Sequence, residues 1–106
     1  MAIVAVSISP VGEGTSVSRF VAAAHEVAQA QDRVRVRLDP MFTTLEGELG
    51  EIYALIREMQ EAVFAAGAVR VGTVIKIDDR RDRAVRMEEK VGAVEALLDA
   101  ARRAES

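Results

Sequence analysis

The sequence predicts one α+β domain over residues 1–106, in which an antiparallel sheet carries helices on one face. Alternating apolar residues mark four strands, and apolar residues spaced three or four apart mark three helices. The elements follow one another as β-α-β-β-α-β with a further helix at the C-terminus, which is the order of the ferredoxin-like sandwich. A chain of 106 residues fits one such domain, and its small core would gain burial through oligomerisation.

The first strand and helix occupy the N-terminal third of the chain. Residues 3–9 alternate between larger apolar side chains and small or polar ones, which is the pattern of a half-buried strand. Pro10 and two glycines interrupt the pattern. A helix is then predicted over residues 15–31, with Ser16 as its N-cap because a serine hydroxyl can accept an orphan backbone N–H. Its apolar stripe would contain Val17, Phe20, Val21, Ala24 and Val27.

Two paired strands come next. Residues 32–40 place apolar side chains inward and three arginines outward, and Asp39-Pro40 ends or bends this strand. Residues 41–48 read as the partner strand, with Thr43 and Leu45 on the inner face. The outer face of this strand would carry Thr44, Glu46 and Glu48.

The C-terminal half predicts helix, strand and helix. A helix is expected over about residues 49–66, and Gly67 suits the position after its C-terminus. The fourth strand covers residues 68–78 and would point Val71, Thr73, Ile75 and Ile77 inward. The last helix runs from about 85 to 101, with one stripe formed by Met87, Val91, Val94, Leu98 and Ala101.

Helices cover only one side of such a sheet, so the other side is open to partners. Strict alternation assigns small, polar and apolar residues to this open face: Ala5, Ser7, Arg35, Arg37, Thr44, Glu46, Glu48, Gly72, Val74, Lys76 and Asp78. A purely solvated face would carry more long charged side chains. Small residues let another subunit's sheet or a flat ligand approach closely. Contact with another subunit is the favoured interpretation.

Composition excludes several classes of function. Acidic and basic residues are interspersed and give a net charge of −3, which is not the basic footprint of a nucleic-acid-binding protein. The chain has no cysteine, so it forms no disulfide and no thiolate metal site. The apolar N-terminus lacks the basic residues of a signal peptide and is too short to span a bilayer. We therefore expect a soluble cytoplasmic protein that binds neither nucleic acid nor membrane.

The run IDDRRDR, residues 77–83, has three interpretations. It could be an ion-paired helix start, with Asp79 bonded to Arg83 and Asp82 to Arg86. It could contribute to a ligand or subunit contact, or its aspartates could bind a hard metal ion. The interleaved arginines would repel a cation, so the ion-paired interpretation is favoured.

Three other polar residues are candidates for chemistry. His25 is the only histidine, and no spacing in the sequence supplies the nucleophile and acid of a catalytic triad, which favours a solvated or interface role. Ser16 and Ser18 could line an anion site at a helix N-terminus. The preceding PVGEGTS lacks the lysine of a P-loop, so a helix cap is the favoured interpretation.

Glu46 and Glu48 lie two residues apart on a strand and would share a face. Paired carboxylates can carry out acid–base chemistry, but with no metal set or nucleophile beside them they more often bind or form ion pairs. In a partly closed space they would suit an organic cation, because carboxylates accept hydrogen bonds from amino groups. Phe42 or Tyr53 could cover a flat ring.

Four segments in this order and spacing, SVSRFVAAA, PMFTTLEGE, RVGTVIKIDDRRDR and KVGAVEALL, resemble the short YkoF-like thiamine-binding proteins. The resemblance covers nearly the whole chain, and TVIKIDDRRD is its most specific part. It implies a ferredoxin-like fold and homo-oligomers, commonly tetramers built as dimers of dimers with packed sheets. It also implies binding of thiamine (vitamin B1) or its hydroxymethylpyrimidine part as ligand, without known catalysis. We expect no catalytic residue, no metal and no resident cofactor.

The resemblance carries over to matching positions in the sequence, which are Thr43, Glu46, Glu48, Lys76 and Asp78. Each of these could contact the ligand or support the subunit interface. Ser7 is of the right chemical type for the aminopyrimidine. Phe42 stands where members of the family usually carry glycine, so its ring could fill, reshape or lid the pocket. Thr43 points inward, and its use requires a bulge or a pocket at the sheet edge.

These inferences predict non-catalytic binding of thiamine or hydroxymethylpyrimidine by a homo-oligomer, for carriage, buffering or sensing. Two alternatives remain. The protein could be a structural or regulatory oligomer without a small ligand, or an enzyme that acts on a thiamine-like substrate with Glu46 or Glu48 as base.

Overall fold

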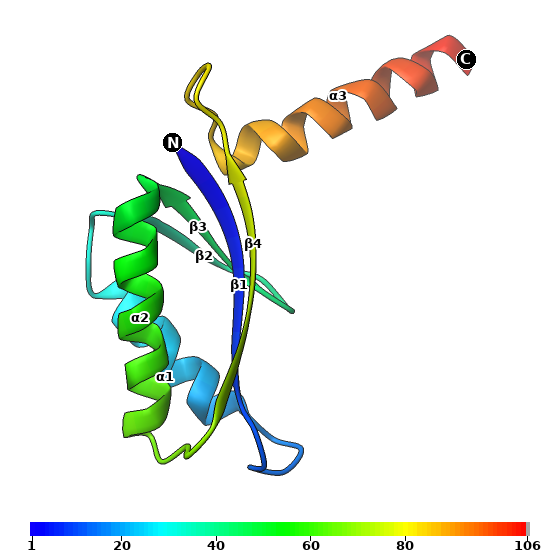
Figure 1. The fold of residues 1–106 in the computed structure, drawn as a ribbon. Helices are drawn as coiled ribbons and strands as arrows, with labels where there is room; N and C mark the ends of the chain where they lie inside the picture. Colours follow the sequence, from blue (N-terminus) through cyan, green and yellow to red (C-terminus); the bar gives the residue numbers. More distant parts are fainter. Residues whose placement is uncertain (106) are drawn as a thin grey trace.

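A computed structural model describes residues 1–105 and places two helices against one face of a four-stranded antiparallel sheet (Figure 1). The predicted ferredoxin-like α+β arrangement is confirmed, and the strand order is β2-β3-β1-β4. The elements are β1 (Ala2–Pro10), α1 (Ser18–Gln29), β2 (Arg35–Leu38), β3 (Thr43–Gly47), α2 (Leu49–Ala65), β4 (Val71–Asp79) and α3 (Met87–Glu105).

The core lies between the sheet and the first two helices. Val4, Val6 and Ile8 of the central strand are buried there, as the alternation of residues 3–9 predicts. Phe20 from α1 and Leu55 from α2 fill the layer opposite them and are fully buried. Burying a side chain of this size contributes about 1.5–3 kcal/mol, so these contacts fix how the helices sit on the sheet.

The helix caps differ from the prediction. Ser16 is exposed and does not cap α1, because the helix begins two residues later and its N-cap is Val17, which has no side-chain hydrogen bond. The cap of α2 is Glu48, whose two carboxylate oxygens accept the N–H groups of Gly50 and Glu51, each at 2.9 Å. These backbone bonds hold the pKa of Glu48 below its ordinary value. Glu48 therefore lies beyond β3, and the prediction that it shares the open sheet face is wrong.

The outer edge of the sheet is less covered than predicted. Ile75 and Ile77 point to the helix side of β4, opposite Val6 and Val4, but remain 40% and 39% exposed. Their inward direction agrees with the prediction, but the helices leave them partly exposed. Of the predicted inward residues of β4, Thr73 is the one hydrogen-bonded to α2, where it accepts from Gln60 at 2.7 Å. Val74 on the opposite face is also exposed. The β4 edge thus presents apolar side chains on both faces.

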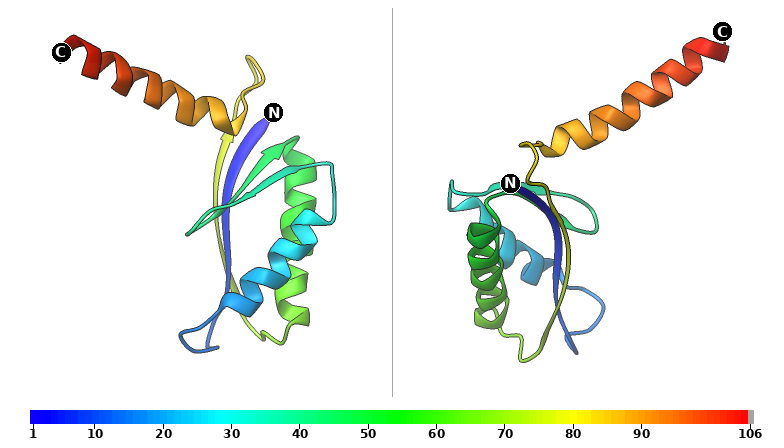
Figure 2. Two further views of the ribbon diagram at one scale, coloured as in Figure 1. Left: turned by 180° about the vertical axis from the view of Figure 1, so that it is seen from behind. Right: turned by 45° about the horizontal axis from the view of Figure 1, so that its top comes forward.

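The last helix projects away from the rest of the chain (Figure 2). It begins at Met87, which is its one buried residue, and the predicted stripe is present but exposed at Val91, Val94 and Leu98. The radius of gyration is 16.5 Å, above the ~13 Å expected for a compact chain of this length. None of the helices in residues 1–105 is long and apolar enough to cross a membrane.

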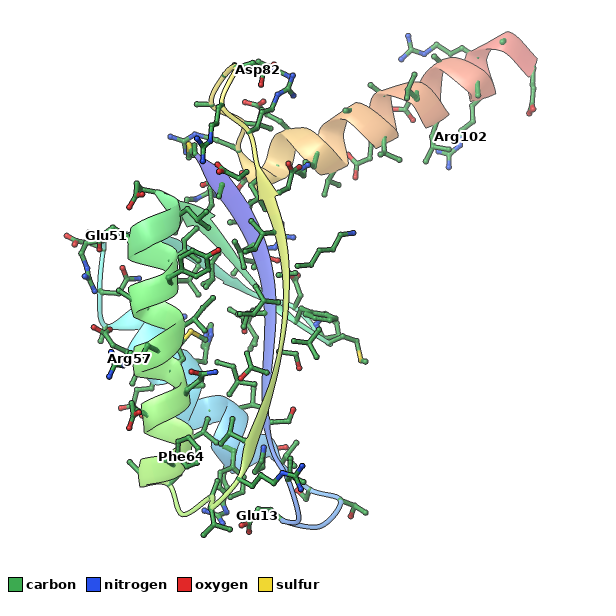
Figure 3. The ribbon with its side chains drawn as sticks, viewed as in Figure 1. Glu13, Glu51, Arg57, Phe64, Asp82 and Arg102 are labelled. Atoms are coloured by element: carbon green, nitrogen blue, oxygen red, sulfur yellow. The ribbon has the colours of Figure 1, made fainter. Side chains whose placement is uncertain are left out.

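The acidic and basic run between β4 and α3 is ion-paired, in different pairs from those predicted. Arg80 bonds Asp82 at 2.6 Å and 2.9 Å, and Arg81 bonds Asp79 at 3.2 Å. Residues 80–86 form a loop and not a helical turn, so partners two residues apart meet instead of partners four apart. Figure 3 shows Asp82 at the outer end of this loop. The bond from Arg80 lowers the pKa of Asp82 to about 2.

Candidate functional site

The sheet is incomplete on one side of β1. The β1–β4 ladder runs the full length of the strand, from Ala2 opposite Asp79 to Pro10 opposite Val71. The β1–β3 ladder stops at Val6 opposite Thr43. Beyond this point the tip of the β2–β3 hairpin diverges from β1 toward the side away from the helices (Figures 1 and 2). Residues 7–9 of β1 therefore have a sheet neighbour on one side only.

A cavity of about 300 Å³ occupies the place where β3 would continue. It is lined by Val6, Ser7, Ile8, Ser9, Val17, Val21, Ala24, Leu38, Asp39, Pro40, Met41, Phe42, Thr43 and Met59. The lining includes residues from both faces of the sheet, since Ile8 points to the core and Ser7 to the open face. Its volume is at the lower end of the range for ligand sites, about 300–1,000 Å³, which suits one small heterocycle.

The polar groups of the cavity come from β1 and the hairpin. Thr43 is 8% exposed, and Ser7 and Ser9 are half-buried. Asp39 is held in place because its Oδ2 accepts the hydroxyl of Thr44 at 2.7 Å and the Nε–H of Arg37 at 3.3 Å. The carboxylate can thus balance a ligand cation without first being ordered.

The apolar lining provides surfaces for a flat ring. Phe42 is half-buried beside Thr43 at the start of β3, and Met59 of α2 is buried at the core side. Met41 is 79% exposed and lies at the outer end of the lining. A ring in this space would lie between aromatic and aliphatic side chains, with oxygen atoms on its edges.

Three of the seven predicted site residues line this cavity, namely Ser7, Phe42 and Thr43. Asp39 is a cavity residue that the sequence does not single out, because Asp39-Pro40 is typical of the end or bend of a strand. The signal that could have found it is an acid placed at the hairpin tip, directly before the residues that carry Phe42 and Thr43.

The other four predicted residues lie elsewhere. Glu48 caps α2, and Lys76 is exposed in the middle of β4. Asp78 lies near the end of β4 and forms an ion pair with Lys90 of α3. Glu46 is 3% exposed, and its carboxylate accepts the N–H of Met87 at 2.8 Å and Nη1–H of Arg35 at 3.0 Å.

Glu46 and Asp78 belong to a row of residues that holds the first turn of α3. Cross-strand pairing sets Asp78, Ile3, Glu46 and Arg35 side by side on the open face. Arg35 also forms an ion pair with Glu88, and Asp78 with Lys90. We name this set, Arg35, Glu46, Asp78, Met87, Glu88 and Lys90, the α3 anchor. These ion pairs hold the first turn of α3 over this end of the open face.

The pKa values of the anchor reflect these contacts. Hydrogen bonds from Arg35 lower the pKa of Glu88 to about 2, and hydrogen bonding to Glu88 and then Glu46 raises the pKa of Arg35. Lys90 lowers the pKa of Asp78. Each shift favours the charged form, as expected for ion pairs.

His25 lies outside the cavity, in a groove on the outer side of α1 that also contains Ser18, Leu38 and Pro40. Its Nδ1 atom is buried without a hydrogen-bond partner among residues 1–105. Within the same residues, no cluster of three or more histidine or acidic side chains is placed to hold a metal ion.

Residues 4–95 match a family model described as "Thiamine-binding protein". The UPF0045 protein YqgV of Bacillus subtilis is 43% identical over 102 residues, covering 92% of this chain and 98% of the relative. A UPF0045 protein encoded in the 3′ region of glkA in Staphylococcus xylosus is 42% identical over 103 residues, covering 93% and 96%. The crystal structure of MJ1052 from Methanocaldococcus jannaschii superimposes with a TM-score of 0.80 at 37% identity, over 89% of this chain and 95% of that one.

Proposed function

The chain belongs to the thiamine-binding protein family, and on that premise we propose that it binds thiamine, or its hydroxymethylpyrimidine half, reversibly in the cavity beside β1. The observation that carries the proposal is the cavity itself. It brings Ser7, Phe42 and Thr43 together with the carboxylate of Asp39 in a space sized for one small heterocycle. All four residues fall within the part of the chain that matches the family model.

The chemistry of thiamine suits this lining. Its aminopyrimidine is a flat ring with hydrogen-bond donors and acceptors on its edge, which hydroxyls and backbone groups can satisfy. Its thiazolium carries a permanent positive charge, which favours a carboxylate such as Asp39 and an aromatic face such as Phe42. The ring methyl groups would pack on the aliphatic side chains.

The proposed activity is binding without chemical change, for carriage, buffering or sensing of thiamine in the cytoplasm. The polar groups of the cavity are hydroxyls and one carboxylate that is already hydrogen-bonded to Thr44 and Arg37. Such groups orient a ligand and compensate its charge, which is what a binding protein requires.

We also propose that the protein acts as a homo-oligomer, in the form of a tetramer. Two apolar surfaces support this: the β4 edge with Val74, Ile75 and Ile77, and the stripe of α3 with Val94 and Leu98. An apolar edge strand in water favours pairing with another chain, and an amphipathic helix with an exposed stripe favours a partner. Together they would bury more apolar surface than one copy of the chain can.

Isothermal titration calorimetry with thiamine and with hydroxymethylpyrimidine tests the binding proposal. Asp39→Asn keeps an oxygen that can accept from Thr44 but removes the charge. We expect it to weaken thiamine binding roughly 5-fold, equivalent to the ~1 kcal/mol of a partly exposed charge contact. Binding of the uncharged pyrimidine should change less.

Asp32→Asn is the matched control, because Asp32 is an exposed aspartate outside the cavity. Mass spectrometry of the titrated ligand checks that thiamine is recovered unchanged. The absence of heat with either compound at high protein concentration would refute the proposal, and a changed product would replace binding by catalysis.

A further inference from the structure

The direction of each backbone group along β1 follows from hydrogen bonds at its two ends. The N–H of Arg80 donates to the carbonyl of Met1 at 3.3 Å, and the N-terminal ammonium of Met1 donates to the carbonyl of Arg80 at 3.4 Å. At the other end the N–H of Val11 donates to Arg70 at 2.8 Å. Residues 1 and 11 therefore both direct their backbone groups toward the β4 side.

Successive residues of an antiparallel strand direct their N–H and C=O groups to alternate sides. The β1–β4 register is continuous from Ala2 to Pro10 without a bulge, so the alternation is unbroken between the two ends. Odd-numbered residues of β1 thus bond toward β4, and even-numbered residues face β3. Pro10, which has no N–H, falls on the side without a partner, in agreement with this assignment.

Ile8 is the even-numbered residue directly beyond the end of the β1–β3 ladder. Its N–H and C=O both point to the side where β3 has stopped, and no partner for either group occurs within residues 1–105. Ile8 is 6% exposed and lines the cavity. A buried backbone donor and acceptor without partners costs free energy comparable to a lost hydrogen bond for each group. This pair is therefore available to a ligand.

One residue's N–H and C=O form an adjacent donor and acceptor that point the same way. A 4-aminopyrimidine carries the complementary pair on one edge, a ring nitrogen that accepts and an amino group that donates. A flat ring in the cavity would continue the sheet in place of β3, as a peptide does in β-strand addition. The thiazolium has no such edge.

We propose that the backbone of Ile8 is the element that recognises the aminopyrimidine edge of the ligand, with its N–H donating to a ring nitrogen and its C=O accepting from the amino group. This inference rests on the proposed function and specifies which half of thiamine supplies the recognition. It also excludes ligands in which the donor and acceptor of that edge are exchanged.

Competing analogues test this recognition. Oxythiamine carries an oxo group in place of the amino group, so that a carbonyl would face the C=O of Ile8 and a ring N–H its N–H. Loss of two hydrogen bonds should weaken its binding roughly 5- to 150-fold relative to thiamine. Hydroxymethylpyrimidine should bind, and the isolated hydroxyethylthiazole should give no measurable heat at the same concentrations.

Amide exchange measured by NMR locates the contact on the protein. In protein labelled with ¹⁵N-isoleucine, the amide of Ile8 should exchange more slowly when thiamine is added. The amides of Ile52 and Ile56 are internal controls, since both lie within α2 and neither residue lines the cavity.

A pair of substitutions removes the donor alone. Ile8→Pro deletes the N–H without breaking the β4 ladder, because that N–H faces the other way, and Ile8→Ala is the matched control that keeps it. We expect the proline variant to bind thiamine at least 3-fold more weakly than the alanine variant. If the proline variant does not fold, the analogue series and the amide exchange still test whether the backbone of Ile8 contacts the ligand.

The outcomes separate this inference from the proposed function. If thiamine binds but oxythiamine binds equally tightly, or if thiamine does not slow exchange of the Ile8 amide, the recognition by Ile8 is refuted. The proposed function then still stands. Failure of thiamine and hydroxymethylpyrimidine to bind overturns both.

Discussion

Replacing Glu46 by alanine should destabilise the protein more than its position on an open sheet face suggests. Glu46 is 3% exposed and accepts hydrogen bonds from Met87 at 2.8 Å and Arg35 at 3.0 Å. In Glu46→Ala the N–H of Met87 loses its acceptor in a buried place, and Arg35 loses one of two carboxylate partners. The hydrogen bonds that join β3 to β2 and to the start of α3 are then lost.

The size of the loss follows from these contacts. A buried N–H without a partner costs about 1–3 kcal/mol, and a hydrogen bond to a charged group contributes about 1.5–3 kcal/mol. Arg35 keeps Glu88 and stays partly solvated, so its term falls at the low end. We expect about 2–4 kcal/mol lower free energy of unfolding. This is a large fraction of the roughly 5–15 kcal/mol typical of a small domain.

Urea unfolding followed by circular dichroism at 222 nm measures the change at one fixed protomer concentration. Glu48→Ala is the matched control, because it removes an equivalent carboxylate that caps α2 at the exposed surface and should cost less than the loss of Glu46. A Glu46→Ala midpoint equal to or above that of Glu48→Ala would refute the assignment of Glu46 to the α3 anchor.

Two further predictions concern the open face. The pKa of Glu88 is lowered from 4.5 to about 2 by Arg35, so its contribution to stability is complete above pH 4.5 and is lost as the pH falls toward 2. The protection factor of the Met87 amide, its exchange rate compared with the intrinsic rate at the same pH, should fall across that window. A constant protection factor from pH 5 to pH 3 would contradict the pairing. Val74→Arg places an unpaired charge on the exposed β4 surface and should shift the protein to a smaller assembly in size-exclusion chromatography with light scattering. An unchanged mass would exclude this surface from the interface.

The strands were predictable because their signal is local. Alternation alone placed Val4, Val6 and Ile8 in the core and Ser7 and Glu46 on the open face, since a one-residue shift would turn the apolar side chains to solvent. The same pattern extended β3 one residue too far. Glu48 continues the alternation in sequence, yet its carboxylate satisfies the first N–H groups of α2, and capping decided its conformation.

The cavity could not be predicted, because it depends on where two distant segments stop pairing. Nothing in residues 41–48 tells that β3 ends beside Val6, and thus nothing tells that the backbone of Ile8 lacks a partner. The role of Glu46 has the same origin. Its Oε1 accepts the N–H of Met87, which is 41 residues away in sequence. The residue type shows that a carboxylate can accept hydrogen bonds, but the tertiary structure decides which residue donates them.

The anchor and the cavity divide β1 between them, and this separation has a consequence. Ile3 lies in the anchor row and Ile8 faces the cavity, five residues or about 17 Å along the strand. Sites farther apart than about 7–10 Å without shared partners usually contribute additively to stability. Loss of the anchor should therefore leave ligand affinity unchanged within a single chain. Because α3 carries the exposed stripe proposed for oligomer contact, any effect of Glu46→Ala on thiamine binding would have to pass through assembly, and it would vanish when affinities are compared at concentrations where both proteins have the same mass.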